Sequence, residues 1–430
     1  MRRVLPLALL LAFVPQPADA IDVDAAATAV DPSVLAWRRD FHQFPELSNR
    51  EFKTGEKVAA QLRALGLEDV RTGVAHTGVT AVLRGGKPGR RIALRADMDA
   101  LPVTEQVDLP FASKVTTEYR NQATGVMHAC GHDAHTAILL GVAKALSEHR
   151  SELAGEVLFV FQPAEEGAPE GEDGGAGLML DEGVFERFKP EAVFGLHMWS
   201  ALNVGQIGYR SGPFMAASDF FKLTVHGKQS HGSRPWDGID PIAIAAEIVS
   251  GAQHIVSREL NISRLPVVVT FGAIQGGIRH NIIPDSVELI GTIRTFDEGM
   301  RADVHARLAR IAEHTAAAHG ATVEHTIPMP GANPVTVNDP ALTAQMLPSL
   351  RKAEGVDEVR EMGLIMGAED FSLYAQKVPG LFFFVGSTPR GQDAAAAPAN
   401  HSPLFFVDEA SLQVGTRALL QVAVDYLGQP

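Results

Sequence analysis

The sequence predicts an α/β fold in which a mainly parallel sheet, flanked by helices, is interrupted by a smaller α+β unit. Short apolar runs rich in β-branched and aromatic residues alternate with helical stretches, as in a sheet that is buried on both faces. Near residue 213 the pattern changes to strands with one polar face, and after residue 330 the first pattern returns. The chain has 430 residues, a length that predicts two or three domains.

The first twenty residues, MRRVLPLALLLAFVPQPADA, have the features of a secretory signal peptide. Two arginines precede a short apolar core at 5–14, and the tripeptide ADA at 18–20 fits a small-x-small cleavage site. We therefore expect a leader at 1–20, secretion across the inner membrane and a periplasmic or extracellular location. No later segment reaches eighteen consecutive apolar residues, so we expect no membrane span.

The first part of the mature chain alternates between predicted helices and buried strands. Asp31 and Pro32 are expected to begin an amphipathic helix, and Ser48 with Glu51 forms a capping box for a second helix that ends at Gly66. Later in this part we expect a helix at 136–149 and buried strands at 80–85, 91–97, 155–162 and 192–197.

The segment from 213 to 329 predicts a separate β-α-β-β-α-β unit. Strands are expected at 219–227, 267–274, 286–296 and 322–328. One helix is expected at 241–260, and a second carries Val304, Leu308, Ile311 and Thr315 at helical spacing. After residue 330 we expect helices near 340–353 and 408–427 and a buried strand at 381–386, so the smaller unit interrupts a discontinuous larger one.

The charge balance limits the classes of partner. The chain has 37 basic and 51 acidic residues and a formal net charge of −14. An acidic chain with no basic run argues against nucleic acid and anionic lipid surfaces, although a locally positive pocket can still bind a small anion.

The chain has a single cysteine, Cys130, in the stretch MHACGHDAH at 127–135. It has no partner for an intrachain disulfide, so it is a buried inert thiol, a metal ligand, a nucleophile or an intermolecular link. Cys130 and His132 are two residues apart in a predicted loop, and extended backbone points such side chains to one side, which favours a metal site. His135, on the helix that follows, need not join them.

Other ligand-type residues follow the predicted strands. They are Asp97 and Asp99 in RADMDALP, Glu165 and Glu166 in FQPAEEG, His197 in FGLHMWS, and His401 in the loop NHSPLFF. Taken singly, each has an ordinary explanation as a turn residue, a solvated acid or a core histidine. The carboxyl ends of strands in an α/β sheet converge on one crevice, so together they predict a metal site. The number of donors exceeds what one zinc ion needs and favours two ions.

Several motifs resemble a known family. MHACGHDAHTA, FQPAEEG, GLHMWS, RADMDALP, MGAEDFSLY and NHSPLF resemble the aminoacylase/carboxypeptidase metallopeptidase superfamily, within it the amidohydrolase branch of hippurate hydrolases and auxin-conjugate (IAA-amino acid) hydrolases. The resemblance extends from RRDFHQFPELS at 38–48 to DEASL at 408–412. It implies a di-metal catalytic domain at 21–212 and 330–430 and a lid or dimerisation domain at 213–329.

The resemblance also implies roles for individual residues. The metal ligands would be Cys130, His132, Glu166, His197 and His401. Glu165 would be the general base, and Asp99 would orient a ligand. In the lid, His231 would stabilise the oxyanion, and in related enzymes this histidine can come from a partner subunit. Asn281 and Arg294 would hold the carboxylate of the substrate.

The implied reaction is hydrolysis of the amide bond of an N-acyl amino acid, or of a short peptide, into a carboxylic acid and a free amino acid. Two divalent metal ions per subunit are implied, with zinc or manganese favoured and nickel or cobalt as alternatives. A homodimer or higher homo-oligomer through the lid is expected. Dipeptidase or carboxypeptidase activity at the same centre is the main alternative. A non-catalytic periplasmic binding protein is disfavoured because it needs no paired glutamates, and a structural zinc site because such sites are closed clusters of four ligands, usually rich in cysteine.

Two departures from the family pattern affect the surroundings of the site. The chain inserts APEGED at 168–173 directly after the glutamate pair, and Trp236 stands where a second histidine is common. The insertion bears on access to the site, and Trp236 bears on the size of the substrate.

Overall fold

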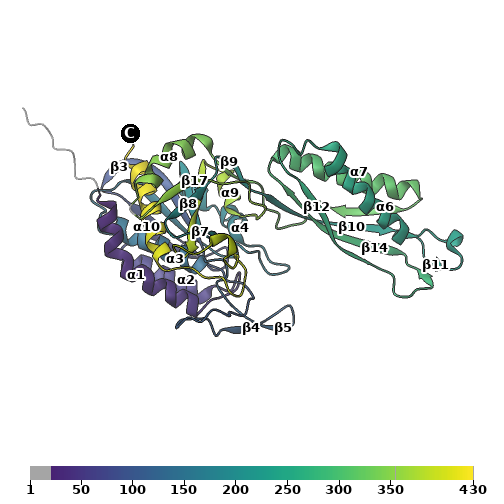
Figure 1. The fold of residues 1–430 in the computed structure, drawn as a ribbon, viewed down its shortest axis with the longest axis horizontal. Coiled ribbons are helices and arrows are strands. Elements are labelled where there is room, and N and C mark those ends of the chain that lie inside the picture. Colours follow the sequence, from purple (N-terminus) through teal and green to yellow (C-terminus); the bar gives the residue numbers. More distant parts are fainter. Residues whose placement is uncertain (1–20, 354, 430) are drawn as a thin grey trace, which may run out of the picture.

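The computed structural model describes residues 21–353 and 355–429, so the leader predicted at 1–20 lies outside the described residues. The described chain forms a larger α/β unit and a smaller elongated unit that projects from one side of it (Figure 1). Within the described ranges, no helix is long and apolar enough to cross a membrane.

Two separate stretches of the chain build the larger unit. Before the smaller unit its elements are α1(Val23–Gln43), α2(Phe52–Ala64), β1(Glu68–Val74), β2(Gly78–Arg84), β3(Lys87–Asp97), β4(Thr116–Tyr119), β5(Gln122–Gly125), α3(His132–Glu148), β6(Ala154–Gln162), α4(Gly175–Asp181), α5(Val184–Phe188), β7(Ala192–Asn203), β8(Gln206–Tyr209) and β9(Gly212–Met215). After it they are β16(Thr336–Asn338), α8(Pro340–Lys352), β17(Glu358–Glu361), α9(Phe371–Ala375), β18(Gly380–Thr388), η3(Ala394–Ala396) and α10(Ala410–Leu427).

The large sheet has eight strands in the order β1-β2-β6-β3-β7-β18-β8-β17. Its central strands β6, β3, β7 and β18 are parallel, whereas β1 and β2 pair in antiparallel fashion at one edge. The predicted mainly parallel sheet is therefore confirmed, and the strand expected at 381–386 is β18, between β7 and β8.

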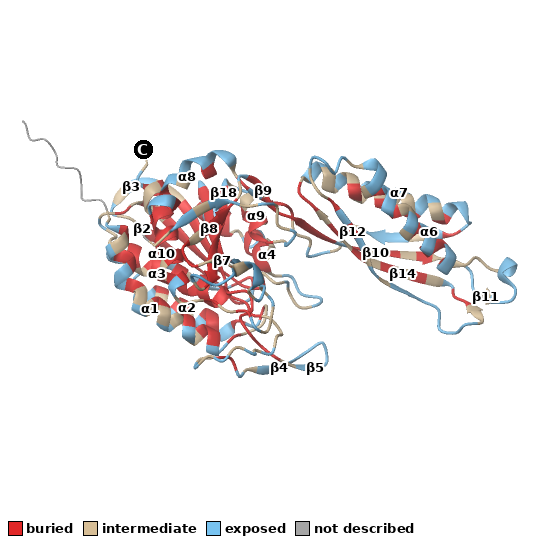
Figure 2. Cartoon of the chain, in the orientation of Figure 1, coloured by how far each residue is buried: buried red, intermediate tan, exposed pale blue. Residues whose placement is uncertain are grey.

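Helices cover both faces of this sheet. Ile92 and Leu94 of β3 face a core shared with α1, α3 and α10, whereas Ala93 between them faces a second core with α4, α5 and α9. Figure 2 shows the buried strands enclosed between these layers. Burial on both faces explains why the strands read as continuous apolar runs.

The smaller unit is a four-stranded antiparallel sheet with two long helices. Its elements are β10(Ala217–His226), β11(Ser230–His231), η1(Pro235–Asp237), α6(Pro241–His254), η2(Ile255–Glu259), β12(Val268–Gly276), β13(Ile282–Ile283), β14(Ser286–Thr295), α7(Glu298–Ala318) and β15(Thr322–Thr326). The strand order is β12-β14-β10-β15. Ile244 and Ile248 of α6 and Leu308 of α7 pack with Leu289 and Ile293 on one face of the sheet. The other face carries exposed side chains such as Phe220.

The chain passes between the two units at two adjacent places. At this junction, Ser218 and Asn333 exchange two backbone hydrogen bonds of 2.9 and 3.0 Å. Beside it, β9 pairs with β16 in the larger unit. The smaller unit is thus an insert whose two ends meet.

Two local predictions were wrong. Helix α1 begins at Val23 rather than at Asp31, because Asp22 caps its first turn by accepting a hydrogen bond of 3.0 Å from the backbone of Ala25. The buried residues Val23, Val30 and Val34 lie along one face of the helix, so the apolar stripe starts before Pro32.

Ser48 and Glu51 form no capping box. The hydroxyl of Ser48 donates to Asp99 instead, over 2.8 Å. The carboxylate of Glu51 is buried and accepts hydrogen bonds from Thr77 and from the backbone of Ala164. Both side chains therefore support the loop that carries the paired glutamates.

Candidate dinuclear metal centre

Cys130 lies in the loop that precedes α3 and His132 is the first residue of that helix, with Gly131 between them. Gly131 has a φ of 95°, a left-handed conformation that favours glycine. A Cβ atom at this position would lie only 2.9 Å from the Cβ of Met198. The glycine therefore allows the loop to pack against β7 and to present the thiol and the imidazole there.

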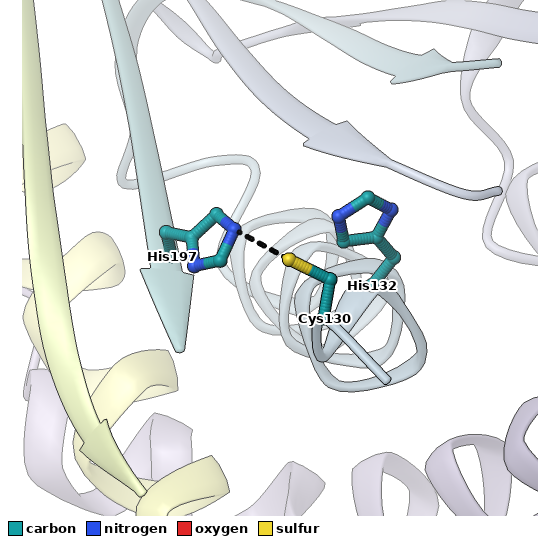
Figure 3. Close-up of side chains that lie close together, drawn as sticks. All are labelled: Cys130, His132 and His197. Carbon is teal, nitrogen blue, oxygen red and sulfur yellow. Dashed lines mark hydrogen bonds between the residues drawn. The ribbon is translucent and has the colours of Figure 1, made fainter. Parts of the chain in front are cut away.

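His197 comes from the middle of β7 and faces Cys130 (Figure 3). Its Nε2 lies 3.3 Å from Sγ of Cys130, and its Nδ1 lies 2.7 Å from the carbonyl oxygen of Met198. Since only a protonated Nδ1 can donate to a carbonyl, Nε2 of the neutral ring has a free lone pair. This is the arrangement in which a histidine binds a metal ion and its other nitrogen fixes the ring.

His132 is fully buried and has one nitrogen without a partner. Its Nδ1 lies 3.2 Å from Oδ1 of Asp99. Its Nε2 has no hydrogen-bond partner and lies 3.9 Å from Oε2 of Glu165 and 4.0 Å from Oε1 of Glu166. Oδ2 of Asp97 is also 3.8 Å from this nitrogen. An unpartnered nitrogen that faces three carboxylates at such distances fits a cation among them.

Asp99 holds the glutamate pair in place. Its two oxygens accept the backbone N–H groups of Glu165 and Glu166, at 3.1 and 3.0 Å, in addition to the hydroxyl of Ser48. One carboxylate thus orients a histidine and the loop after β6, which is the kind of position that the resemblance implied for it.

His401 approaches from the C-terminal part of the chain. Its Nε2 lies 3.1 Å from Oε1 of Glu166, and its backbone N–H donates to the carbonyl of Ala129 over 2.8 Å. The side chain is half exposed, unlike the other donors. His401 thus lies at the open side of the centre.

The five predicted ligands fall into two overlapping groups. Cys130, His132 and His197 form one group, and Cys130, Glu166 and His401 form the other, with all donor atoms of a group within 4.8 Å of one another. A set of one thiolate, three imidazoles and a carboxylate suits borderline divalent ions rather than calcium or magnesium. The residues present therefore fit two divalent ions.

The electrostatics of the site also indicate that it is built for cations. Burial, together with the carboxylates of Glu166 and Glu165, raises the pKa of the Cys130 thiol well above its usual value. Burial, with the repulsion of Glu369 and Glu166, raises the pKa of Glu165 as well. Divalent ions reverse this effect, because they stabilise a coordinated thiolate and the neighbouring carboxylates.

Asp97 and His135 lie beneath the ligands, and reasoning from the sequence missed their role. Nδ1 of His135 is 2.6 Å from Oδ1 of Asp97, and its Nε2 accepts the backbone N–H of Met198 over 2.7 Å. Both nitrogens of His135 are therefore engaged, in agreement with the expectation that it need not bind metal. Asp97 is not a turn residue but a buried partner of this histidine.

A second network, also missed, lies deeper. The buried guanidinium of Arg95 contacts Asp97, Glu369 and Asp370 at 2.7, 2.9 and 2.8 Å. Glu369 and Asp370 come from the motif MGAEDFSLY, which the resemblance included without a role for any residue in it.

The structure does not bring the three lid residues to this centre within one chain. His231 lies on β11, which Figure 1 places at the end of the smaller unit that is remote from the larger one. Asn281 lies beside it, since its carbonyl accepts the backbone N–H of Gly232 over 2.8 Å. Arg294 lies at the junction end of β14, eight residues beyond Ser286, or about 26 Å at the rise of a strand. Asn281 and Arg294 therefore lie apart in one chain, and their joint role in holding a carboxylate stays a prediction.

Comparison with known proteins gives consistent results. The model of peptidase family M20/M25/M40 matches residues 93–425. The chain is 41% identical over 398 residues to thermostable carboxypeptidase 1 of Saccharolobus solfataricus, covering 92% of this chain and 96% of that one. It is 40% identical over 399 residues to IAA-amino acid hydrolase ILR1-like 4 of Arabidopsis thaliana, covering 92% and 86%.

A solved structure is also similar. The YXEP protein of Bacillus subtilis, described as a dinuclear metal-binding peptidase of the M20 family, superposes with a TM-score of 0.77 at 36% identity, covering 93% of this chain and 99% of that one. The likeness extends over both units.

Proposed function

The chain belongs to peptidase family M20/M25/M40. We propose that it is an amidohydrolase of N-acyl amino acids and that the leader predicted at 1–20 directs its export. The family makes it a metal-dependent hydrolase, and the donor set is that of a centre for two divalent ions. The proposed substrates are hippurate-like conjugates, in which an amide joins an acyl group to an amino acid with a free carboxylate. The products are a carboxylic acid and a free amino acid.

The paired glutamates carry this proposal. The side chains of both face Nε2 of His132, but only Glu166 also lies against His401. Adjacent residues thus have different surroundings, and one can bind an ion while the other handles a proton. A protein that only captures a ligand has no use for the second glutamate.

Bound divalent ions would lower the pKa of a water molecule and polarise the scissile carbonyl. Cys130, His132, Glu166, His197 and His401 would hold them. Glu165 takes a proton from the attacking water and passes it to the nitrogen of the leaving amine. Because Asp99 fixes the backbone of Glu165, the carboxylate is in position before the substrate arrives.

Arg294 is proposed to hold the carboxylate of the amino acid. Its Nη1 is buried and has no hydrogen-bond partner, and burial lowers the pKa of its guanidinium. A guanidinium in this state gains most from a carboxylate that arrives with two acceptor oxygens. This explains how an acidic chain binds an anionic substrate.

His231 and Asn281 are proposed to act in the site of a partner subunit. They lie together at the remote end of the smaller unit, which separates them from the ligands of their own chain. Nδ1 of His231 accepts from the backbone N–H of Ser233 over 3.0 Å, so a proton on Nε2 is free to donate to an oxyanion. This proposal requires a homodimer or a higher homo-oligomer.

A carboxypeptidase or dipeptidase function is the second candidate. The similarity to a protein named thermostable carboxypeptidase 1 favours it, since a free substrate carboxylate is common to both reactions. The amidohydrolase is preferred because the motifs resemble that branch of the superfamily.

The deciding experiment is hydrolysis of a mixed panel of N-acyl amino acids and dipeptides, followed by mass spectrometry. The mature protein is stripped of metal and reloaded separately with zinc and with manganese, the two favoured ions, and then with nickel and cobalt. Metal-dependent release of amino acids from acyl conjugates is expected. Cleavage of dipeptides alone would support the peptidase instead, and tight binding without turnover would contradict both.

Export is tested separately. Expression of the full chain followed by fractionation and N-terminal sequencing should give a protein that begins at Ile21 outside the cytoplasm. A retained Met1 would contradict the proposed leader.

A further inference from the structure

A second pocket lies on the large unit, away from the metal centre. Its floor is the face of the sheet formed by Val82 of β2 and Leu158 of β6, and its walls are β1 on one side and Phe188 of α5 on the other. The cavity measures about 70 Å³, several times the 10–15 Å³ or so that one ordered water needs. It can therefore hold the head group of a small molecule.

Arginines dominate this pocket. Arg71, Arg84, Arg91 and Arg187 line it, and Asp69 is the one carboxylate among the lining residues. The whole chain has a net charge of −14, so a group of four guanidinium groups around one small cavity is unusual for this chain. Such a concentration of like charge repels itself unless anions compensate it.

The carboxylates nearby compensate only two of the four arginines closely. Arg71 pairs with Asp69 at 3.1 Å, and Arg84 pairs with Glu68. Glu156 lies farther off, 3.8 Å from Arg84 and 3.6 Å from Arg91.

The other two arginines retain unused hydrogen-bonding capacity. Nε of Arg91 is buried and has no hydrogen-bond partner, and its guanidinium lies 4.7 Å from the ring centroid of Phe188. Arg187 donates to the carbonyl of Glu182 and has no carboxylate within ion-pair distance among the described residues. Donors of this kind match the oxygens of a phosphate or a carboxylate.

We propose that this pocket binds a compact oxyanion, a phosphate or carboxylate group, at a site distinct from the metal centre. Arg91 and Arg187 supply the unpaired donors, and Arg71 and Arg84 add charge. A ligand with an apolar portion next to its anionic group would also contact Phe188.

The pocket is separate from the catalytic centre. Arg91 and Asp97 lie six residues apart on the same strand, β3, which corresponds to about 20 Å. Asp97 is the last residue of β3 and lies beside the ligand His132, whereas Arg91 lies in the amino-terminal half of the strand. An anion bound here is therefore neither substrate in the active site nor a ligand of the metals.

Isothermal titration calorimetry of the metal-loaded enzyme tests the proposal. Inorganic phosphate and benzoate are titrated separately, with ionic strength held constant by sodium chloride. We expect saturable binding of at least one of them, weakened tenfold or more in Arg187→Gln and further in Arg91→Gln/Arg187→Gln. Arg360→Gln, an exposed arginine of β17 outside the pocket, is the matched control and should bind as the wild type does.

Each outcome decides the matter. Whichever of phosphate and benzoate binds more strongly shows whether the pocket prefers a phosphate or a carboxylate group. Absence of heat from both anions overturns the proposal. So does binding that is unchanged in Arg187→Gln, because an anion bound at the metals would be insensitive to this substitution. Arg187 is exposed, so its replacement is expected to leave the fold intact.

Discussion

Glu165 and Glu166 are adjacent in the sequence and have identical side chains, but these side chains have different surroundings. Both backbone N–H groups bind the same carboxylate, Asp99, yet the side chains diverge. The side chain of Glu166 contacts His401. The side chain of Glu165 lies near His132, and burial together with Glu369 raises its pKa. At the scale of single residues, we propose that these different surroundings make Glu166 the metal ligand and Glu165 the residue that transfers a proton.

Replacement of Glu165 by glutamine should separate these tasks. Glu165→Gln keeps the size of the side chain and removes the base, so turnover should fall by about 10²–10⁴-fold while both ions remain bound. Measurement of kcat together with metal content by mass spectrometry checks this. Loss of metal in parallel with activity would instead make Glu165 a ligand.

Some of the residues at the site could be predicted from the sequence and others could not. Cys130 and His132 were predicted because an isolated cysteine beside histidines is a local pattern. His135 and Asp97 depend on a contact between α3 and β3, and Ser48 reaches Asp99 across 51 residues. No local pattern encodes those pairings, since each side chain also had an ordinary local explanation as a cap, a turn or a helix residue.

At the scale of elements, the start of α3 is sensitive to a change of its backbone. The left-handed Gly131 joins Cys130 to His132 and packs against Met198 of β7. Strand and helix must approach this closely for His197 to reach the thiol.

Gly131→Ala should therefore weaken both folding and metal binding. The left-handed conformation alone costs a residue with a Cβ about 1–2 kcal/mol, and the contact with Met198 adds to it. Chemical unfolding and competition with a chelator measure the two effects. Gly391→Ala is the control, because Gly391 has a φ of 80° but no atom within 4 Å of the added Cβ. Equal effects of both substitutions would contradict the close packing.

In the smaller unit, a buried ion-pair cluster joins β10 to α7. Asp219 is fully buried and accepts hydrogen bonds from Arg301 at 2.7 Å and from His305 at 3.0 Å. Burial by itself would raise the pKa of Asp219, but the hydrogen bonds from His305 and Arg301 outweigh it and hold the pKa below its usual value. The contribution of Asp219 to stability is therefore fully present above about pH 4, its pKa range in the unfolded chain, and is lost as the pH falls through the folded pKa.

Asp219→Asn should consequently destabilise the smaller unit at pH 7 by about 1.5–3 kcal/mol, because it removes charge-assisted hydrogen bonds while Arg301 keeps its ion pair with Glu298. The difference from the wild type should shrink below about pH 4, where the wild-type carboxylate is lost as well. Calorimetric unfolding between pH 3 and pH 7 measures it. Glu324→Gln, at an exposed site in β15, is the control and should leave the melting temperature unchanged. A difference in stability between the wild type and Asp219→Asn that stays constant with pH would contradict the role given to the Asp219 carboxylate.

At the scale of the whole molecule, the extended shape separates residues proposed for one reaction. The proposed metal ligands lie in the larger unit, and His231 lies at the remote end of the smaller one (Figure 1). A symmetric dimer solves this geometry if each smaller unit serves the other subunit.

Mixing of two inactive variants tests that arrangement. Glu165→Gln and His231→Ala are each expected to be nearly inactive alone. In a mixed dimer, the subunit with intact Glu165 receives His231 from its partner, so after random exchange about a quarter of wild-type activity should return. Mixtures that stay inactive although exchange is shown by native mass spectrometry would place His231 in its own subunit's site.

The order of strands in the large sheet constrains the order in which the two units can fold during synthesis. Strand β18 lies between β7 and β8 although it follows them by more than 170 residues, and the whole smaller unit is synthesised in between. The emerging chain can complete the insert, whose strands and helices are contiguous in sequence, while the large sheet still lacks a central strand. A chain that stops at residue 379 should therefore contain a protease-resistant fragment spanning 217–329 and a digestible remainder. Since His401 is translated later still, the five predicted ligands cannot come together until nearly the whole chain has been made.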